Sequence, residues 1–160
     1  MTTVALPRRV RFRPLEWASS TDHKLIAMRL FASAFGFFLL SGVLALVMRT
    51  ELARPGMQVV SHDEYNQLFT MHGSGMLYLV LVPVALALGV YLVPLQIGAP
   101  RIAAPRLACV CDWAILAGGL TMYAGFLTQD GAARSGWTAF YPLSATSTHR
   151  GRGPTCGSSG

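Results

Sequence analysis

Charged side chains are scarce in this chain. Asp, Glu, Lys and Arg make up 12% of its 160 residues, whereas soluble domains carry roughly 25%. Hydrophobic residues account for 52% of the sequence. This balance excludes an ordinary soluble domain and predicts a membrane protein.

Acidic residues are the scarcer charge, with 7 Asp and Glu against 13 Lys and Arg, a formal net charge of +6. The basic residues flank long apolar runs, as the positive-inside rule expects, so we predict no nucleic-acid partner. They precede the first run or lie between the second and third: Arg8, Arg9, Arg11, Arg13, Lys24, Arg101 and Arg106. This bias predicts a cytoplasmic N-terminus and 95–106 loop, with the 49–66 loop and the C-terminus outside.

Cysteine is also rare. Cys109, Cys111 and Cys156 are odd in number and form no disulfide framework. We interpret the Cys109-x-Cys111 pair as small packing residues. The first 22 residues lack a short apolar core and a small-residue cleavage site, so we expect no signal peptide.

Long apolar runs are abundant. Each is about 20 residues or longer, the length that crosses ~30 Å of hydrocarbon. We therefore predict an all-α membrane protein with three transmembrane helices. The predicted parts are a basic arm (1–22), a helical region (23–129) with spans at about 25–48, 67–94 and 107–127, and an outer-side loop with a tail (130–160).

The tail has a different character from Ser144 onwards. It lacks periodicity and has almost no apolar content, which is typical of disorder. We interpret His149 and Cys156 there as incidental. The tail also fits a frameshifted or truncated gene, a hypothesis that the nucleotide sequence would test.

Three ionisable residues interrupt the runs: Arg29, His72 and Asp112. Such a side chain is costly inside a membrane and usually functional. Imidazole is a common metal ligand, and the glycines beside His72 would let a flat macrocycle come close. The alternative is a neutral histidine that is hydrogen-bonded to another helix. A six-coordinate haem would need its second axial ligand from elsewhere, because no other histidine lies inside a run.

Arg49 ends the first run on the predicted outer side. An arginine there could donate hydrogen bonds to a polar substituent of a cofactor. It could also anchor the helix at the membrane interface, as arginines at span ends commonly do. The residues themselves leave both alternatives open.

The order of motifs in this chain resembles the N-terminal third of subunit I of the haem-copper terminal oxidases, closest to the actinobacterial cytochrome c oxidases. The most specific block is Tyr65–Gly73, YNQLFTMHG. The resemblance covers roughly residues 20–144, and its other segments are Asp22–Ile26, Met48–Leu52, Pro55–Gly56, Tyr91–Pro100, Pro105–Leu107, Gly131–Ala133 and Gly136–Ala139.

The resemblance implies a fold and several residue roles. The three helices would correspond to the first part of a twelve-helix subunit I bundle. His72 would be one axial ligand of the low-spin haem, haem a in the cytochrome c oxidases. Arg49 would interact with the formyl group of that haem, and Trp137 would lie near its propionates. Glu51 would contribute to a calcium or sodium site together with backbone carbonyls of the following turn.

The resemblance also implies a parent activity, electron transfer from cytochrome c to oxygen with proton translocation in aerobic respiration. The expected location is a bacterial plasma membrane, with cytochrome c, other oxidase subunits and the lipid bilayer as partners. The second haem, the copper and their ligands belong to later helices of the family. We therefore expect this chain alone to be inactive. A quinol oxidase subunit I is an alternative within the family.

Several positions depart from the family pattern. Polar or acidic family residues at the entrance of a proton channel are replaced here by Val90, Arg101, Ala108, Cys109 and Cys111. Arginine in place of aspartate puts a cation at the mouth, and a cation repels an incoming proton. We expect poor proton conduction by this route.

Two hypotheses of different classes follow. The first is a truncated or divergent oxidase subunit I in which His72 binds haem. The second is a non-catalytic three-helix membrane protein, or a pseudogene product, that packs against partners.

Overall fold

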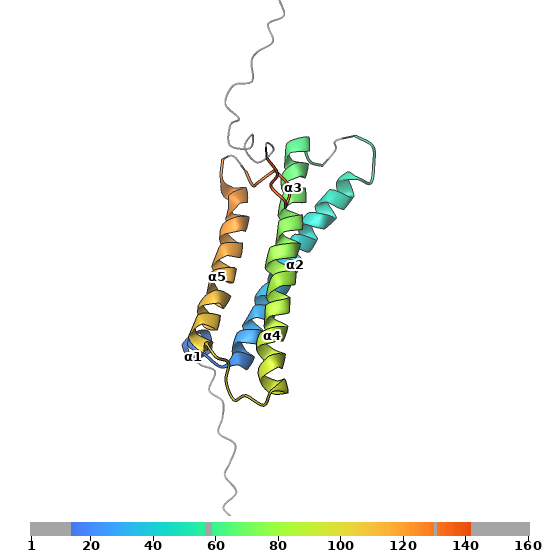
Figure 1. The fold of residues 1–160 in the computed structure, drawn as a ribbon. Helices are drawn as coiled ribbons and strands as arrows, with labels where there is room; N and C mark the ends of the chain where they lie inside the picture. The colour runs from blue at the N-terminus through green and yellow to red at the C-terminus, as the bar shows by residue number, and fades with distance from the viewer. Residues whose placement is uncertain (1–13, 57–58, 130, 142–160) are drawn as a thin grey trace, which may run out of the picture.

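The computed structural model describes residues 14–56, 59–129 and 131–141. These described residues form helices and connecting loops without a strand. Three continuous helical stretches are long and apolar enough to cross a membrane: His23–Glu51, His62–Gln96 and Pro105–Leu127. They alternate in direction (Figure 1). The predicted all-α membrane fold with three candidate spans is therefore confirmed.

A short helix, α1 (Pro14–Ser19), precedes the first span. The sequence predicted only a basic arm over these residues, so this helix was not anticipated. Pro14 is the first helical residue, where a missing N–H breaks no hydrogen bond. The rest of the predicted arm, 1–13, lies outside the described residues. The first span, α2 (His23–Glu51), is capped by Asp22, whose side chain accepts a hydrogen bond from the Lys24 amide at 3.1 Å.

The second span joins three segments, α3 (His62–Ser74), the π-helical η1 (Gly75–Leu81) and α4 (Val82–Gln96). It starts with a reciprocal capping box between Ser61 and Glu64. A proline inside a span predicts a local departure from α-helical geometry. Around Pro83 that departure is the π-helical stretch, in which the Val82 amide donates to the Leu77 carbonyl five residues earlier.

The third span, α5 (Pro105–Ala124), ends in the 3₁₀ turn η2 (Gly125–Leu127). It approaches α2 closely at Gly119, where an added Cβ would clash with the Phe37 ring. The neighbouring Gly118 faces open space. Glycine at this one position therefore lets the two helices meet.

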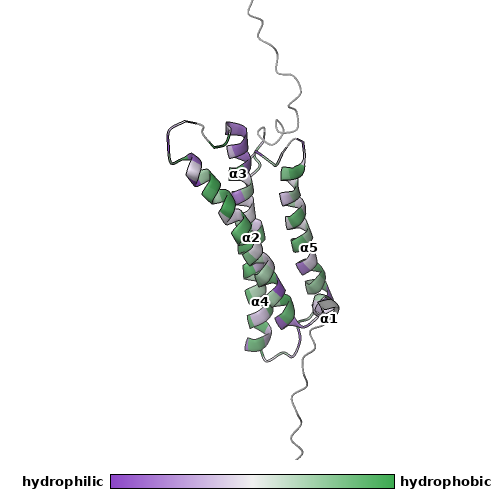
Figure 2. Ribbon diagram, turned by 180° about the vertical axis from the view of Figure 1, so that it is seen from behind, coloured by the Kyte–Doolittle hydropathy of each residue, from purple (hydrophilic) through white to green (hydrophobic). Residues whose placement is uncertain are grey.

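Most of the apolar surface of the spans points outward. Figure 2 shows hydrophobic residues along most of α2, α4 and α5, and hydrophilic residues at the start of α3. Large side chains such as Phe35, Leu46 and Leu120 are 58–67% exposed. The buried cluster is small and centres on Ile26 and Leu30 of α2, packed against α4 and α5. Lipid or further protein must cover the rest.

Candidate functional site

His72 is held against the middle of α2. Its Nδ1 lies 2.8 Å from the backbone carbonyl oxygen of Ser41. A carbonyl only accepts hydrogen bonds, so Nδ1 carries a proton, and a neutral ring then has its lone pair on Nε2. No described residue forms a hydrogen bond with Nε2. The ring is thus bonded to another helix through one nitrogen and retains the other as a potential metal ligand.

The close approach of the second span to α2 depends on Gly75, one turn after His72. A Cβ at Gly75 would clash with Ser41 Oγ, and it would lie 2.8 Å from the Tyr123 hydroxyl. These two hydroxyl groups are hydrogen-bonded at 2.7 Å. Gly75 therefore admits neighbouring helices, whereas the sequence suggested that the glycines here would admit a macrocycle.

A loop from the end of the third span lies along one face of α3. Ala132 donates its amide hydrogen to Gln67 Oε1 at 2.9 Å, and Gly136 donates its own to Thr70 Oγ1 at 3.0 Å. Gly131 adopts a positive φ of 73°, and a side chain there would press on the Gln67 amide. The two acceptors are three residues apart, so they share a helix face.

The same loop carries Trp137 to the His72 region. An ideal Cβ on Gly73 would lie 3.5 Å from Trp137 Cδ1, so the indole packs on α3 directly beside His72 in sequence. Trp137 is still 49% exposed. An ion pair between Arg134 and Asp63, 3.2 Å apart, anchors the loop one turn before Gln67. Contacts along α3 therefore place Trp137 against Gly73, the residue that follows His72.

Arg49 lies in the last turn of α2 and is exposed. It follows Ser41 by eight residues, about 12 Å along a helix axis. Both ribbon views show this end of α2 leaning away from α3 (Figures 1 and 2). Arg49 therefore lies farther toward the end of the bundle than the His72–Ser41 contact.

Glu51 is 6% exposed at the end of α2. Its Oε2 accepts hydrogen bonds from the amides of Val59 and Val60, at 2.7 and 3.0 Å. It also lines a cleft of about 680 Å³ with the turn that follows, residues 52–56, and with His62 and Tyr65. In the described part of the chain, no three His, Cys, Asp or Glu side chains gather as a metal site. A cation here would need backbone oxygens besides the one carboxylate.

Three of the five positions that depart from the family pattern lie together in the structure. Val90, Ala108 and Cys111 line one cavity of about 280 Å³ between α2, α4 and α5. Its other lining residues are apolar, except Asp112, whose Oδ2 lies 2.6 Å from Arg29 Nε. Arg101 is exposed in the loop between α4 and α5.

Cys109 packs against the Ile26–Leu30 cluster but does not line that cavity. Its sulfur accepts a hydrogen bond from Arg29 Nη2 at 3.4 Å. The interpretation of the cysteine pair as small packing residues therefore describes Cys109 incompletely, because this thiol takes part in a polar cluster.

The profile of the family described as Cytochrome C and Quinol oxidase polypeptide I matches residues 25–156. The chain belongs to this family. The match runs twelve residues beyond Ser144, where the sequence had suggested that the resemblance ends. The described three-helix arrangement accordingly corresponds to the first helices of an oxidase polypeptide I, an integral membrane protein.

Individual relatives agree with the oxidase family. The chain is 50% identical over 139 residues to the "Putative cytochrome c oxidase subunit 1-beta" of Streptomyces coelicolor, covering 87% of this chain and 24% of the relative. It is 48% identical over 126 residues to cytochrome c oxidase subunit 1 of Corynebacterium efficiens, covering 79% of this chain and 22% of the relative. The chain thus spans about a quarter of the length of these relatives.

Oxidases of this family bind haem and copper and function with other oxidase subunits. The donor chemistry at His72 fits a haem, since an imidazole with Nδ1–H bonded to a backbone carbonyl is the form that ligates a metal through Nε2. Among the described residues, His72 is the one histidine within the apolar part of a span, so a second axial histidine for such a haem would have to come from elsewhere.

Sequence reasoning missed Ser41, Gln67 and Thr70. Their signal was present as polar residues inside otherwise apolar spans. Gln67 and Thr70 stand at a spacing of three, and Thr70 precedes His72 by two. Ser41 could not be paired with His72 from sequence, because the contact joins two helices across 31 residues.

Proposed function

We propose that this chain forms the first three helices of an oxidase subunit I and that His72 is one axial ligand of its low-spin haem, haem a. The observation that carries this proposal is the 2.8 Å contact between His72 Nδ1 and the Ser41 carbonyl. That bond fixes the tautomer and the ring orientation, and it raises the basicity of Nε2. A bound haem would supply one-electron transfer.

Two further side chains would contact the haem edge. Trp137, packed beside α3 at Gly73, would face the propionates. Arg49 would donate hydrogen bonds to the formyl group, and its rigid planar guanidinium suits an oxygen acceptor.

The activity proposed for the whole subunit is electron transfer from cytochrome c to oxygen with proton translocation, in a bacterial plasma membrane. Cytochrome c and other oxidase subunits would be partners, and quinol remains the alternative donor within the family. The N-terminus would be cytoplasmic. We expect no oxygen reduction by this chain alone, because the second haem and the copper are held by later helices of the family.

Glu51 would have a second role as a ligand of calcium or sodium. Its burial and the adjoining cleft favour a cation held with carbonyl oxygens of the 52–56 turn. Calcium added to the purified chain should then slow amide exchange at Val59 and Val60. An equal effect in a Glu51→Gln variant would contradict this assignment.

The haem assignment is tested with the full chain in nanodiscs. Haem is titrated in the presence of free imidazole, which substitutes for the second axial ligand, and the low-spin absorption spectrum is recorded. His72→Ala should abolish this spectrum. His62→Ala is the matched control, because it removes a histidine from the first turn of the same helix and should leave the spectrum intact. A spectrum unaffected by His72→Ala would remove the residue from its proposed role.

One observation favours the non-catalytic alternative. The cavity at the proton-entrance positions is almost wholly apolar, and its acid is paired with Arg29. A three-helix protein that only packs against partners would retain these features without binding haem. Absence of any low-spin spectrum in the wild-type titration would favour this alternative.

A further inference from the structure

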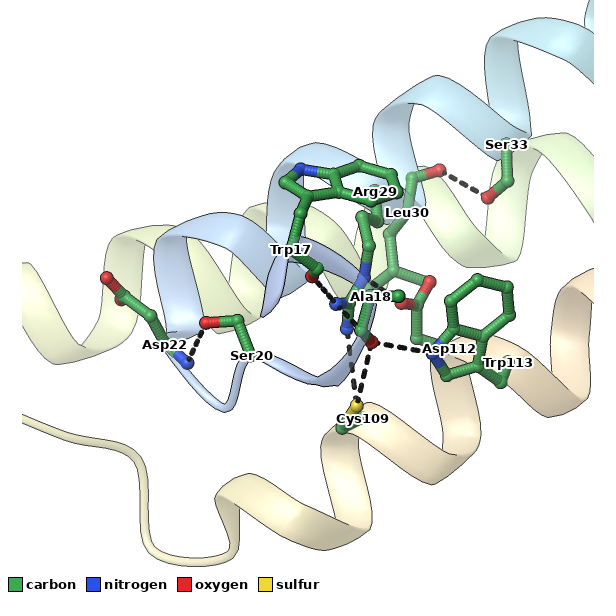
Figure 3. Close-up of polar contacts among 10 residues, drawn as sticks. All are labelled: Trp17, Ala18, Ser20, Asp22, Arg29, Leu30, Ser33, Cys109, Asp112 and Trp113. Atoms are coloured by element: carbon green, nitrogen blue, oxygen red, sulfur yellow. Dashed lines mark hydrogen bonds and ion pairs between the residues drawn. The ribbon is translucent and has the colours of Figure 1, made fainter. Parts of the chain in front are cut away.

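The basic end of the bundle contains a polar cluster around a buried arginine. This end comprises α1, the start of α2, the α4–α5 loop and the start of α5. Arg29 is 4% exposed, and its guanidinium donates to Asp112 Oδ2 at 2.6 Å and to the carbonyls of Trp17 and Ala18 at 2.7 and 2.9 Å (Figure 3). Its Cζ lies 5.7 and 5.8 Å from the ring centroids of Trp17 and Trp113. This arginine cluster joins α1, α2 and α5.

The cluster fixes the position of the Ala18 carbonyl relative to α5. Besides Arg29, the indole N–H of Trp113 donates to this oxygen at 3.0 Å. Donors from α2 and α5 thus converge on the last turn of α1 (Figure 3). The end of α1 is consequently held at a set distance from the α5 face.

A cleft of about 650 Å³ lies between these two walls. One wall is the end of α1 and the following turn, with Ala18, Ser19 and Thr21. The other wall is a single face of α5, since its residues recur at helical spacing: Arg106, Cys109, Val110 and Trp113. Arg106 is the one charged side chain among the described residues that line it.

The polarity of the cleft changes along the axis of α5. Arg106 is the second residue of α5, at the end of the span. Val110 and Trp113 follow toward the bilayer interior, and Trp113 lies about 10 Å deeper than Arg106 along the helix axis. A phospholipid has the same gradient, with a phosphate at the surface and an acyl chain below it.

We propose that this cleft binds one anionic phospholipid of the surrounding bilayer. The headgroup phosphate lies at Arg106 near the hydroxyl-bearing turn of Ser19 and Thr21, and an acyl chain packs on Val110 and Trp113. Because the one charged side chain among the described lining residues is basic, the cleft complements an anionic headgroup better than a zwitterionic one.

The arginine cluster makes the cleft a preformed site. Hydrogen bonds within the protein hold its two walls together in the absence of lipid. Lipid binding therefore requires little additional ordering of the protein. One basic residue near a membrane surface contributes about 1 kcal/mol of attraction to anionic lipid, or about fivefold in affinity. The proposal goes beyond the haem role of His72 and is independent of it.

The test uses the full chain in liposomes that contain phosphatidylglycerol or phosphatidylcholine with brominated acyl chains. Bromine quenches nearby tryptophan, and Trp113 lines the cleft. We expect brominated phosphatidylglycerol to compete about fivefold better than brominated phosphatidylcholine for the quenched site. Arg106→Gln should remove this preference, and Arg106→Lys should retain most of it.

Arg101→Gln is the matched control, because it removes the same charge from the loop just before α5 without altering the cleft lining. It should leave the preference within about twofold of wild type, as expected for an exposed and screened charge outside the cleft lining. Equal losses in the Arg101 and Arg106 variants would indicate diffuse attraction and overturn the proposal. Equal quenching by both lipids in wild type would overturn it too, since the cleft would then lack headgroup selectivity or contain another protein segment.

Discussion

Burial of Arg29 or Asp112 alone would be unfavourable in free energy. The contact between them therefore determines how much stability a substitution at either position removes. Both side chains are about 5% exposed, and their charged atoms are 2.6 Å apart. Removal of one partner leaves an uncompensated charge in a medium of low dielectric constant. Replacement of both side chains by apolar residues leaves no uncompensated charge.

We therefore expect Arg29→Leu and Asp112→Leu each to lower the free energy of unfolding by about 3–5 kcal/mol. The double variant should lose much less than the sum. Unfolding in mixed micelles, followed by helical circular dichroism, measures the cycle. Strictly additive losses would show that the two side chains do not interact in the membrane.

Isolated charges in the spans were visible in the sequence, but their pairing was not. Arg29 and Asp112 were evident as interruptions of apolar runs, and His72 as a candidate ligand. Arg29 and Asp112 are separated by 83 residues, and their distance depends on how α5 docks on α2. A single sequence gives the depth of a residue in a span, whereas the direction in which it faces is decided by tertiary packing.

The loop that carries Trp137 is held to α3 by side-chain acceptors. Gln67→Ala should raise the amide exchange rate of Ala132 by about fivefold, because one hydrogen bond contributes about 1 kcal/mol net. Asn66→Ala is the control, since its exposed side chain is one residue away and outside this contact. Hydrogen exchange with mass spectrometric readout measures both variants. Similar rates in the two variants would contradict the docking role of Gln67.

Adjacent glycines in α5 give a matched pair for helix association. Gly119→Ala should cost about 1–3 kcal/mol, because its methyl group would overlap the Phe37 ring. Gly118→Ala should be neutral or stabilising by up to about 1 kcal/mol, since it faces open space and alanine favours helix. Unfolding in mixed micelles compares the two. Equal stability would mean that α5 does not approach α2 at this point.

The existence of the three long helices was predictable from the length of the apolar runs. The short helix and the internal geometry of the spans were less predictable. Apolar stretches of this length satisfy their backbone hydrogen bonds in lipid by forming helices. The short helix α1 was missed because the sequence assigned its residues to a basic arm, and Pro14 stands where a helix tolerates it. The π-helical stretch has no signature in hydropathy.

At the scale of the whole molecule, the cavity between α2, α4 and α5 should exclude water. Dry cavities are apolar, and the Asp112 carboxylate at this wall is held by Arg29. In liposomes with an internal pH dye, the wild-type chain should pass protons no faster than empty vesicles. A variant with Val90→Asn, Ala108→Asn and Cys111→Ser should pass them faster. Rapid flux through the wild-type chain would contradict the expected loss of this route.

The π-helical stretch η1 determines how the second span can follow α2. Buried residues recur there at every fourth position: Met71, Gly75, Leu79, Pro83 and Ala87. In a uniform α-helix, four residues rotate by about 40° more than a full turn, so this row of buried residues would wind around the helix. The π-helical turns of η1 are wider, so they reduce this excess rotation. Deletion of one residue within 76–81 would therefore rotate His72 relative to α4. The imidazole ring of His72, which lies next to this row of buried residues, would then face another direction, although the span would stay helical.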